Sequence, residues 1–229
     1  MTALPSTPAA RLRTGLRRFT GPRPPAVERC ELCAAEVGAG HRHLVDTERR
    51  ALACACTACA MLFDRPGGAG AQPGTDAGRF RTVPDRYLSD PDAALDDGSW
   101  AGLQIPVGMV FFLRDGASGQ VTAFYPSPAG ATESELEPQA WEAVRAATPL
   151  ADELAPDVEA LLLRHHQHRS ACFLVPVDAA YELVGRMRRR WQGFDGGAEA
   201  HAELELFFDH VTRRAQRAHH AHEPSKGRA

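Results

Sequence analysis

The sequence predicts an α+β protein in which a small zinc-ribbon-like β-hairpin module is followed by an α+β domain with an antiparallel hairpin and several helices. The first reason is that five of the six cysteines lie between Cys30 and Cys59, a density typical of a metal-stabilised module. The second is a pair of largely apolar runs, 107–113 and 120–125, which flank a glycine-containing turn and favour an antiparallel hairpin. The third is apolar residues at helical spacing, most clearly in 179–191.

Composition restricts the classes of protein to which the chain can belong. The 229 residues, 44% of them hydrophobic, are enough for one ordinary domain with a small appendage. A net charge of −3 and a pI near 6.4 argue against a dedicated nucleic-acid binder. We expect no membrane span and no secretory signal, because no run of apolar residues is long enough. The chain is therefore expected to be cytoplasmic, where thiols stay reduced, so the clustered cysteines are interpreted as metal ligands.

Changes in composition divide the chain into five parts. Residues 1–25 are interpreted as a flexible basic arm, and residues 26–64 as the zinc-ribbon-like metal module. The glycine-rich segment 65–79 has the composition of a linker, and residues 80–212 form the predicted α+β domain. Residues 213–229 are expected to be a disordered tail.

The module is expected to fold around a β-hairpin. Residues 43–46 are short and strand-like, residues 47–50 are a polar turn, and residues 51–56 return with alternating character. Residues 30–63 hold few apolar side chains, so we expect metal binding and folding of the module to be one event.

Two Cys-x-x-Cys turns flank this hairpin and define the predicted metal site. Each turn offers a pair of thiolates, and the hairpin would bring the four sulfurs together in a tetrahedron suited to zinc. The predicted ligands are Cys30, Cys33, Cys56 and Cys59. Four thiolates leave no open position on the ion, so the site is expected to be structural or an interaction platform, not a hydrolytic centre.

Iron is the alternative metal, because two Cys-x-x-Cys turns also suit a rubredoxin-like centre that transfers electrons. Rubredoxin turns usually carry glycine after the second cysteine and are surrounded by aromatic residues. Here Ala34 and Ala60 take the glycine positions, and no aromatic residue lies between Cys30 and Cys59, so zinc is favoured.

Three further residues in the module could bear on the metal. Cys54 is interpreted as a buried thiol beside the site, with participation in a larger iron–sulfur cluster as the alternative. His41 and His43 could substitute for a cysteine ligand, since imidazole replaces thiolate in many zinc sites, although four cysteines are already paired.

The second domain opens with an acidic loop at 89–97 and the hairpin at 107–125. The segment Tyr125–Ser134 is rich in proline, hydroxyl-bearing and small residues. It is interpreted either as a ligand-contacting loop or as a connection into a helix capped by Ser134 with Glu137.

Helical patterns dominate the C-terminal part of the chain. We expect a short helix around Trp141 ending at Thr148, a helix over 156–163, a strand at 171–175, a helix over 179–191 and a last helix over 202–210. Cys172 is expected to be a core residue, and the glycines of 193–197 to break the chain. The histidines after the predicted 156–163 helix are attributed to its C-terminal end rather than to a metal site; they are His165, His166 and His168.

No phosphate-binding glycine loop and no nucleophile-elbow motif occurs in the sequence, so no enzyme activity is predicted.

The chain resembles an uncharacterised bacterial family, a domain of unknown function associated with gene neighbourhoods of nickel–iron hydrogenases. The resemblance rests on Cys30-Glu-Leu-Cys33, His43-Leu-Val-Asp46, Cys54-Ala-Cys56-Thr-Ala-Cys59, Gln104-Ile-Pro-Val107, Phe124 to Ser134, Phe173-Leu-Val-Pro-Val-Asp178, Tyr181-Glu-Leu-Val-Gly185 and Trp191 to Gly197.

This resemblance implies a non-enzymatic metal-binding accessory protein that assists assembly or maturation of a redox metalloenzyme such as nickel–iron hydrogenase. The implied partner is a hydrogenase subunit or maturation factor, and the alternative role is an electron carrier serving that enzyme. The segments 125–134 and 191–197 are the expected contact surface. The oligomeric state is left open.

Overall fold

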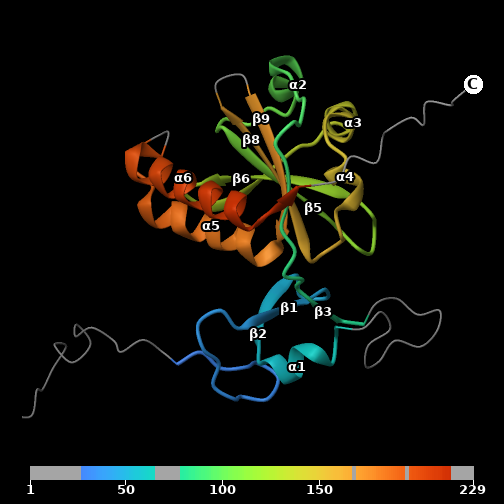
Figure 1. The fold of residues 1–229 in the computed structure, drawn as a ribbon, viewed down its shortest axis with the longest axis vertical. Coiled ribbons are helices and arrows are strands. Elements are labelled where there is room, and N and C mark those ends of the chain that lie inside the picture. Colours follow the sequence, from blue (N-terminus) through green and yellow to red (C-terminus); the bar gives the residue numbers. More distant parts are fainter. Residues whose placement is uncertain (1–26, 65–77, 167–168, 194–195, 218–229) are drawn as a thin grey trace, which may run out of the picture.

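A computed structural model describes residues 27–64, 78–166, 169–193 and 196–217. A small sheet and a large sheet account for the strands of these residues, and together with the helices they confirm the predicted α+β class. Figure 1 shows the small sheet and α1 below the large sheet, which carries helices on both faces. In the described parts of the chain, no helix has the length and apolar character needed to cross a membrane.

The N-terminal module is built on the predicted hairpin of β1 (Arg42–Asp46) and β2 (Ala51–Ala55), followed by α1 (Thr57–Met61). The third strand of its sheet is β3 (Phe80–Thr82), which pairs antiparallel with β1. The composition of the chain had placed these three residues at the start of the second domain. The core of the module is small, as expected, and consists of Cys30, Leu44, Ala53, Ala55 and Ala60.

The large sheet has seven strands in the order β10-β4-β9-β8-β5-β6-β7. All its neighbouring strands run antiparallel except β10 and β4, which run parallel. The strands are β4 (Leu88–Asp90), β5 (Met109–Arg114), β6 (Val121–Ser127), β7 (Gly130–Ser134), β8 (Glu159–His166), β9 (Arg169–Pro176) and β10 (Gln216–Arg217).

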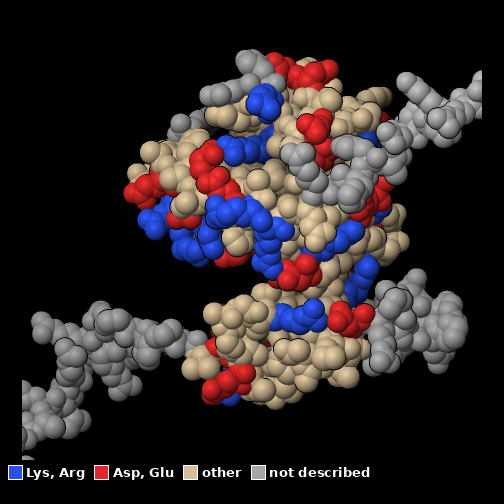
Figure 2. All heavy atoms as spheres, viewed as in Figure 1, with Lys and Arg blue, Asp and Glu red and all other residues tan. Residues whose placement is uncertain are grey.

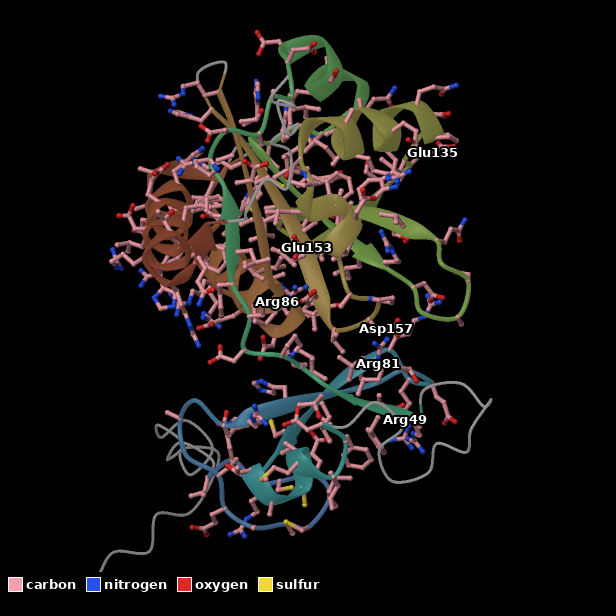
Figure 3. All side chains as sticks on the ribbon, turned by 45° about the vertical axis from the view of Figure 1, so that its right-hand side comes forward. Arg49, Arg81, Arg86, Glu135, Glu153 and Asp157 are labelled. Carbon is pink, nitrogen blue, oxygen red and sulfur yellow. The ribbon has the colours of Figure 1, made fainter. Side chains whose placement is uncertain are left out.

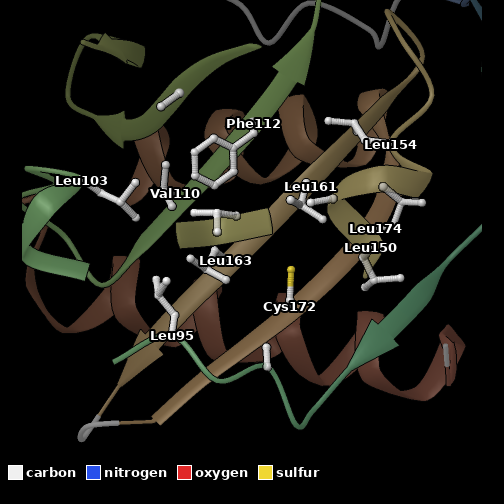
Figure 4. Packing of buried hydrophobic residues seen from close by; sticks show 14 of the residues in the cluster. Leu95, Leu103, Val110, Phe112, Leu150, Leu154, Leu161, Leu163, Cys172 and Leu174 are labelled. Atoms are coloured by element: carbon white, nitrogen blue, oxygen red, sulfur yellow. The ribbon is translucent and has the colours of Figure 1, made fainter. Parts of the chain in front are cut away.

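Helices cover both faces of this sheet. The helices α5 (Val177–Arg190) and α6 (Gly197–Arg214) pack on one face. The helices α3 (Pro138–Ala147) and α4 (Leu150–Glu153) pack on the other, with α2 (Asp97–Gly102) at its edge. Figure 4 shows the second core, in which Cys172 lies among leucines as predicted.

The predicted helix over 156–163 is wrong, because these residues enter β8. This strand lies at the centre of the sheet, and its residues from Glu159 to Leu163 are all buried. Leu161 and Leu163 face one core, whereas Ala160 and Leu162 face the other. A strand buried on both faces shows no alternation, and leucine and alanine favour helices, so the pattern was misleading. His165 and His166 therefore end a strand, and His168 lies outside the described residues.

The predicted loop at Tyr125–Ser134 is also wrong, because most of it forms the hairpin of β6 and β7. Ser127 pairs with Gly130, whose φ of 118° suits glycine at the turn. Pro126 is tolerated in β6 because the pairing with β5 ends at Phe124, so no ladder needs its missing N–H group. Ser134 lies in β7, and the helix after it has Glu137 at its N-cap without a side-chain hydrogen bond.

Other boundaries shift less. The predicted acidic loop overlaps the end of β4 and contains the cap of α2, where the Asp96 carboxylate accepts a hydrogen bond from Ser99 N. The last helix extends well beyond 202–210 in both directions. Gln216 and Arg217, within the expected tail, form β10 beside β4. The basic arm 1–25, most of the linker and the end of the tail lie outside the described residues.

The surface formed by α5 and α6 carries charged side chains of both signs. Figure 2 shows arginines gathered over α5 and α6 with acidic side chains among them. Arg186 pairs with Glu182 at 2.6 Å, and Arg190 pairs with Glu199 at 3.3 Å. Opposite charges therefore alternate along this face.

Candidate metal centre

The structure brings the four predicted cysteine ligands together. The sulfur atoms of Cys30, Cys33, Cys56 and Cys59 all lie within 4.8 Å of one another, and Cys33 Sγ is 3.7 Å from Cys56 Sγ. A tetrahedral zinc ion with zinc–sulfur bonds of about 2.3 Å places its sulfurs roughly 3.8 Å apart. The four side chains therefore fit one four-coordinate metal ion.

The first Cys-x-x-Cys turn is held by its own backbone. Ala34 N donates to Cys30 O at 2.8 Å, and Cys30 N donates to Ala35 O at 2.8 Å. Closing this turn puts Ala34 in the left-handed region with a φ of 60°, where glycine is the usual residue. Glu31 N donates to Cys54 O at 2.8 Å, which fastens the turn to the end of β2.

The second turn uses the start of α1. Cys56 is the N-cap of this helix, and its Sγ accepts a hydrogen bond from Cys59 N at 3.5 Å. Cys59 lies in the first turn of the helix, three residues after Cys56. This spacing brings the two sulfur atoms close together. Ala60 is helical, so only the first of the two turns requires a left-handed residue.

The site is buried on one side and open on the other. Cys30 is 1% exposed and belongs to the module core, whereas Cys33 is exposed. Phe63 and Phe80 pack against this core with their ring centroids 5.6 Å apart. Aromatic residues are absent from the sequence between the cysteines, but these two phenylalanines lie after Cys59 in the chain, and folding brings them to the site.

The thiols differ in how readily they ionise. Burial opposes ionisation of Cys30, but hydrogen bonds from the backbone of Cys56, Cys33 and Leu32 outweigh it and lower the pKa of Cys30 to about 6. The Cys59 thiol bonds to the sulfurs of Cys56 and Cys33, which favours its neutral form and raises its pKa to about 12. A metal ion that binds all four sulfurs must displace the protons that remain.

Cys54 is not part of the four-cysteine cluster. It is half-buried, and its sulfur groups with one ring nitrogen each of His41 and His43. Of the two interpretations for Cys54, the larger sulfur cluster lacks support in the described residues, and the thiol instead faces histidines. The two histidines likewise do not substitute for a cysteine ligand of the first site.

Residues from both predicted contact segments line one cavity, although the first segment is a hairpin and not a loop. Tyr125, Ser127 and Trp191 line a cavity of about 460 Å³ between the end of β6 and the helices α5 and α6. His165 also lines it, but both of its ring nitrogens have partners: Nδ1 lies 2.9 Å from Ser170 Oγ and Nε2 lies 3.0 Å from Asp97 Oδ1. This histidine is therefore engaged in structural contacts.

Sequence reasoning missed one residue at the edge of the module. Asp178, in the first turn of α5, has its Oδ2 atom 2.8 Å from His43 Nδ1. The hydrogen bond raises the pKa of His43 above its usual value, against the opposing effect of burial. No local pattern marks Asp178, because its partner is 135 residues earlier in the chain.

Comparison with protein-family models places the chain in a family. A protein-family model described as "Family of unknown function (DUF5947)" matches residues 29–215, a range that includes all four cysteines and the strands from β1 to β9. Neither the curated proteins nor the solved structures contain a match.

Proposed function

The chain belongs to the family of unknown function DUF5947, and we propose that it is a non-enzymatic accessory protein whose N-terminal module is organised by one bound zinc ion. The ligands in this proposal are Cys30, Cys33, Cys56 and Cys59. The observation that carries it is the convergence of four sulfurs from two separate turns to within 4.8 Å. A zinc ion with four thiolates has no open position, so its role is to hold the module in shape.

The folding requirement of the module supports this role. Its core consists of one leucine, three alanines and Cys30, with half-buried residues around them. Such a core buries little apolar surface to offset the conformational entropy lost on folding. A structural zinc ion contributes about 10–16 kcal/mol to the folding of comparable small modules.

A partner protein is the second part of the proposal. Leu32 lies inside the first cysteine turn and is 40% exposed, and Met61 and Leu62 at the end of α1 are 61% and 56% exposed. Apolar side chains exposed next to a metal site favour contact with another protein. The resemblance to a family found near nickel–iron hydrogenase genes narrows that partner to a hydrogenase subunit or maturation factor, whose assembly the chain would assist.

The competing role is a one-iron electron carrier at the same cysteines. Exposure of Cys33 would bring the metal close to a redox partner, and Phe63 and Phe80 supply the aromatic packing that the sequence between the cysteines lacks. The left-handed Ala34 also reproduces the turn at which glycine is usual in rubredoxins.

Metal analysis of the untagged protein tests the site and separates the two roles. We expect one tightly bound zinc ion per chain and a colourless protein, and loss of that ion in Cys56→Ser. Cys172→Ala is the matched control, because Cys172 lies in the core of the large domain and should leave the metal content unchanged. A coloured protein with one iron per chain would favour the electron carrier, and full zinc content in Cys56→Ser would contradict the four-cysteine site.

Affinity capture tests the partner. Tagged protein from a host expressing a nickel–iron hydrogenase should retain a hydrogenase subunit or maturation factor, and Leu32→Asp should weaken this capture without loss of zinc. Capture of neither component, with the zinc site intact, would contradict the accessory role.

A further inference from the structure

A second set of metal-ligand side chains lies on the hairpin of the module, apart from the four-cysteine cluster. In the antiparallel pairing of β1 and β2, His43 lies directly opposite Cys54. His41 precedes His43 by two residues, the spacing that returns a side chain to the same face of an extended segment. One ring nitrogen of each histidine and the sulfur of Cys54 lie within 4.8 Å of one another.

The hydrogen bonds of His41 leave one nitrogen free for a metal. Its Nδ1 atom lies 3.0 Å from the carbonyl oxygen of Gly38 and 3.4 Å from a carboxylate oxygen of Glu28. Both oxygens can only accept, so Nδ1 must carry the proton and Nε2 presents a lone pair when the ring is neutral. The side chain is only 9% exposed, and Nε2 is buried without a hydrogen-bond partner among the described residues.

A buried ring nitrogen without a partner is costly, and buried polar atoms in folded proteins are rarely left so. The neighbouring His43 ring does not provide the missing hydrogen-bond partner. Its Nδ1 atom contacts Asp178 at 2.8 Å, and His41 Nε2 has no partner among the described residues. The two rings pack with their centroids 4.7 Å apart. A cation between the rings and Cys54 would satisfy the His41 nitrogen.

Asp178 supplies the outer contact that metal-binding histidines normally have. Histidine ligands usually donate their second N–H group to a carboxylate or a carbonyl, which fixes the tautomer and the ring orientation. His43 meets a carboxylate and His41 meets a carbonyl, so both rings are held in the form that directs Nε2 away from these partners. The carboxylate belongs to α5, so this site, unlike the four-cysteine site, depends on contact between the module and the large domain.

Both histidines line a cleft of about 740 Å³ between the module and the large domain, together with Arg42, Tyr87, Asp178 and Arg214. Figure 2 shows the surface indented between these two parts of the protein. Three protein ligands leave one position of a tetrahedral ion open, and an ion held by the histidines would be reached from this cleft.

We propose that His41, His43 and Cys54 form a second metal site for a divalent transition-metal ion such as Zn²⁺, with Asp178 positioning His43 and one coordination position open to the cleft. Two imidazoles and one thiolate suit such ions better than Mg²⁺ or Ca²⁺, which prefer oxygen ligands. Bond lengths of about 2.0–2.3 Å require the three ligand atoms to approach one another by roughly 1.5 Å at most.

Cobalt provides the test, because a thiolate bound to Co²⁺ gives a near-ultraviolet charge-transfer band that a histidine-only site lacks. Full-length protein that retains one zinc ion per chain, without added zinc, is titrated with Co²⁺, and bound zinc and cobalt are counted after desalting. We expect one cobalt ion per chain with the sulfur band, alongside the zinc ion already present. Other histidines of the chain could also bind Co²⁺, so the sulfur band is the deciding signal.

Three variants and one control show which residues bind the cobalt ion and give rise to the sulfur band. His41→Ala and Cys54→Ala should weaken cobalt binding at least about 100-fold, and Cys54→Ala should abolish the band. Asp178→Asn should weaken binding about 10–100-fold while the band remains at saturation. His210→Ala removes an exposed histidine from α6 and should change nothing.

Retained zinc in each variant shows that the module is still folded and keeps this test separate from that of the four-cysteine site. Absence of a sulfur band in the native protein, or its persistence in Cys54→Ala, would overturn the second site while leaving the first intact. Loss of the first site would instead show as absent zinc in the native protein.

Discussion

Arg81 Nη1 in β3 lies 2.8 Å from Asp157 Oδ2 and 2.8 Å from the carbonyl oxygen of Pro156, just before β8. Figure 3 shows Arg81 and Asp157 facing each other between the module and the large domain. Valines from both sides pack at the same junction: Val45 and Val83 contact Val158 and Val177. The two parts of the chain are therefore joined by an ion pair over a small apolar core, and the ligands of both proposed metal sites lie on the module side of this junction.

Loss of Arg81 should loosen the junction. Arg81→Met keeps the side-chain stem but removes the donor to Asp157 Oδ2 and one of two donors to the Pro156 carbonyl oxygen, at a half-buried contact. Val158 N still donates to Pro156 O, and Gly116 N still donates to Asp157 Oδ1. We expect a loss of about 1–3 kcal/mol in the free energy of unfolding, measured by urea denaturation. Arg50→Met is the control, because Arg50 is 81% exposed where it pairs with Asp115 and should cost less than about 1 kcal/mol. Equal costs for the two variants would contradict a special role for Arg81.

Arg86 compensates a buried carboxylate in the large domain. Its Nε and Nη2 atoms lie 2.8 and 2.7 Å from the two carboxylate oxygens of Glu159, which is 1% exposed. Arg86→Met should cost about 3 kcal/mol, because Glu159 keeps only its bond from Ala155 N and Arg86 is itself partly exposed. Thermal and urea unfolding measure this cost.

A surface arginine offers the comparison for Arg86. Arg145 pairs with Asp152 at 2.9 Å, but both side chains are exposed. Arg145→Met should therefore cost less than about 1 kcal/mol. If Arg86→Met were equally mild, the Glu159 carboxylate would not depend on its arginine.

The clustering of the four cysteines could be predicted because its signal is local and chemically specific. Two Cys-x-x-Cys turns and the strands between them lie within thirty residues, and their geometry follows from short-range backbone hydrogen bonds. The second ligand set could be predicted only in part from the sequence. His41 and His43 could be seen as possible ligands, but the register that places His43 opposite Cys54 and the approach of Asp178 arise from long-range folding.

The two main errors in secondary structure have different physical causes. Amphipathic helices such as α5 expose one face, so their period is visible in the sequence. β8 is covered on both faces, and its run of apolar residues carries no period of either kind. The hairpin containing Pro126 was missed for another reason, because the chain cannot reveal where the neighbouring strand stops pairing.

Replacing Ala34 with glycine should stabilise the module. Its φ of 60° costs an L-residue about 1–2 kcal/mol, and glycine removes most of this cost. Ala34→Gly should therefore stabilise the zinc-loaded module by about 1 kcal/mol, measured as slower zinc release to a competing chelator and a higher melting temperature. Ala35→Gly is the control, since Ala35 has a negative φ and should lose about 0.5–1 kcal/mol. A destabilised Ala34→Gly would show that this turn is not strained.

Cys172 should be inert to thiol reagents in the folded protein. Burial is the main cause that raises its pKa to about 12, from 9.0 for an ordinary thiol. At pH 8 only about one molecule in ten thousand carries the thiolate that reacts. Mass spectrometry after treatment with a disulfide reagent should find Cys172 unmodified until denaturant is added. Modification in the native protein at the rate seen in denaturant would contradict its place in the core.

The same pKa has a consequence for stability at high pH. Between about pH 9 and 12 the unfolded state loses the Cys172 proton while the folded state keeps it. The unfolded state then binds fewer protons, so the free energy of unfolding should fall as the pH rises through this range. Cys172→Ala should flatten that part of the profile, and an unchanged slope would assign the decline to other groups.

Metal removal should separate the two parts of the protein. A strong chelator, or Cys56→Ser, should remove the proposed zinc ion and with it the support of the small module core, whereas the large sheet has two extensive cores of its own. Limited proteolysis should then cleave between residues 30 and 63, and added zinc should restore protection in the chelated protein but not in Cys56→Ser. The far-ultraviolet circular dichroism should keep most of its intensity, because α3, α5 and α6 belong to the large domain. A module that resists protease without metal would mean that its apolar contacts and its junction with the large domain suffice to fold it.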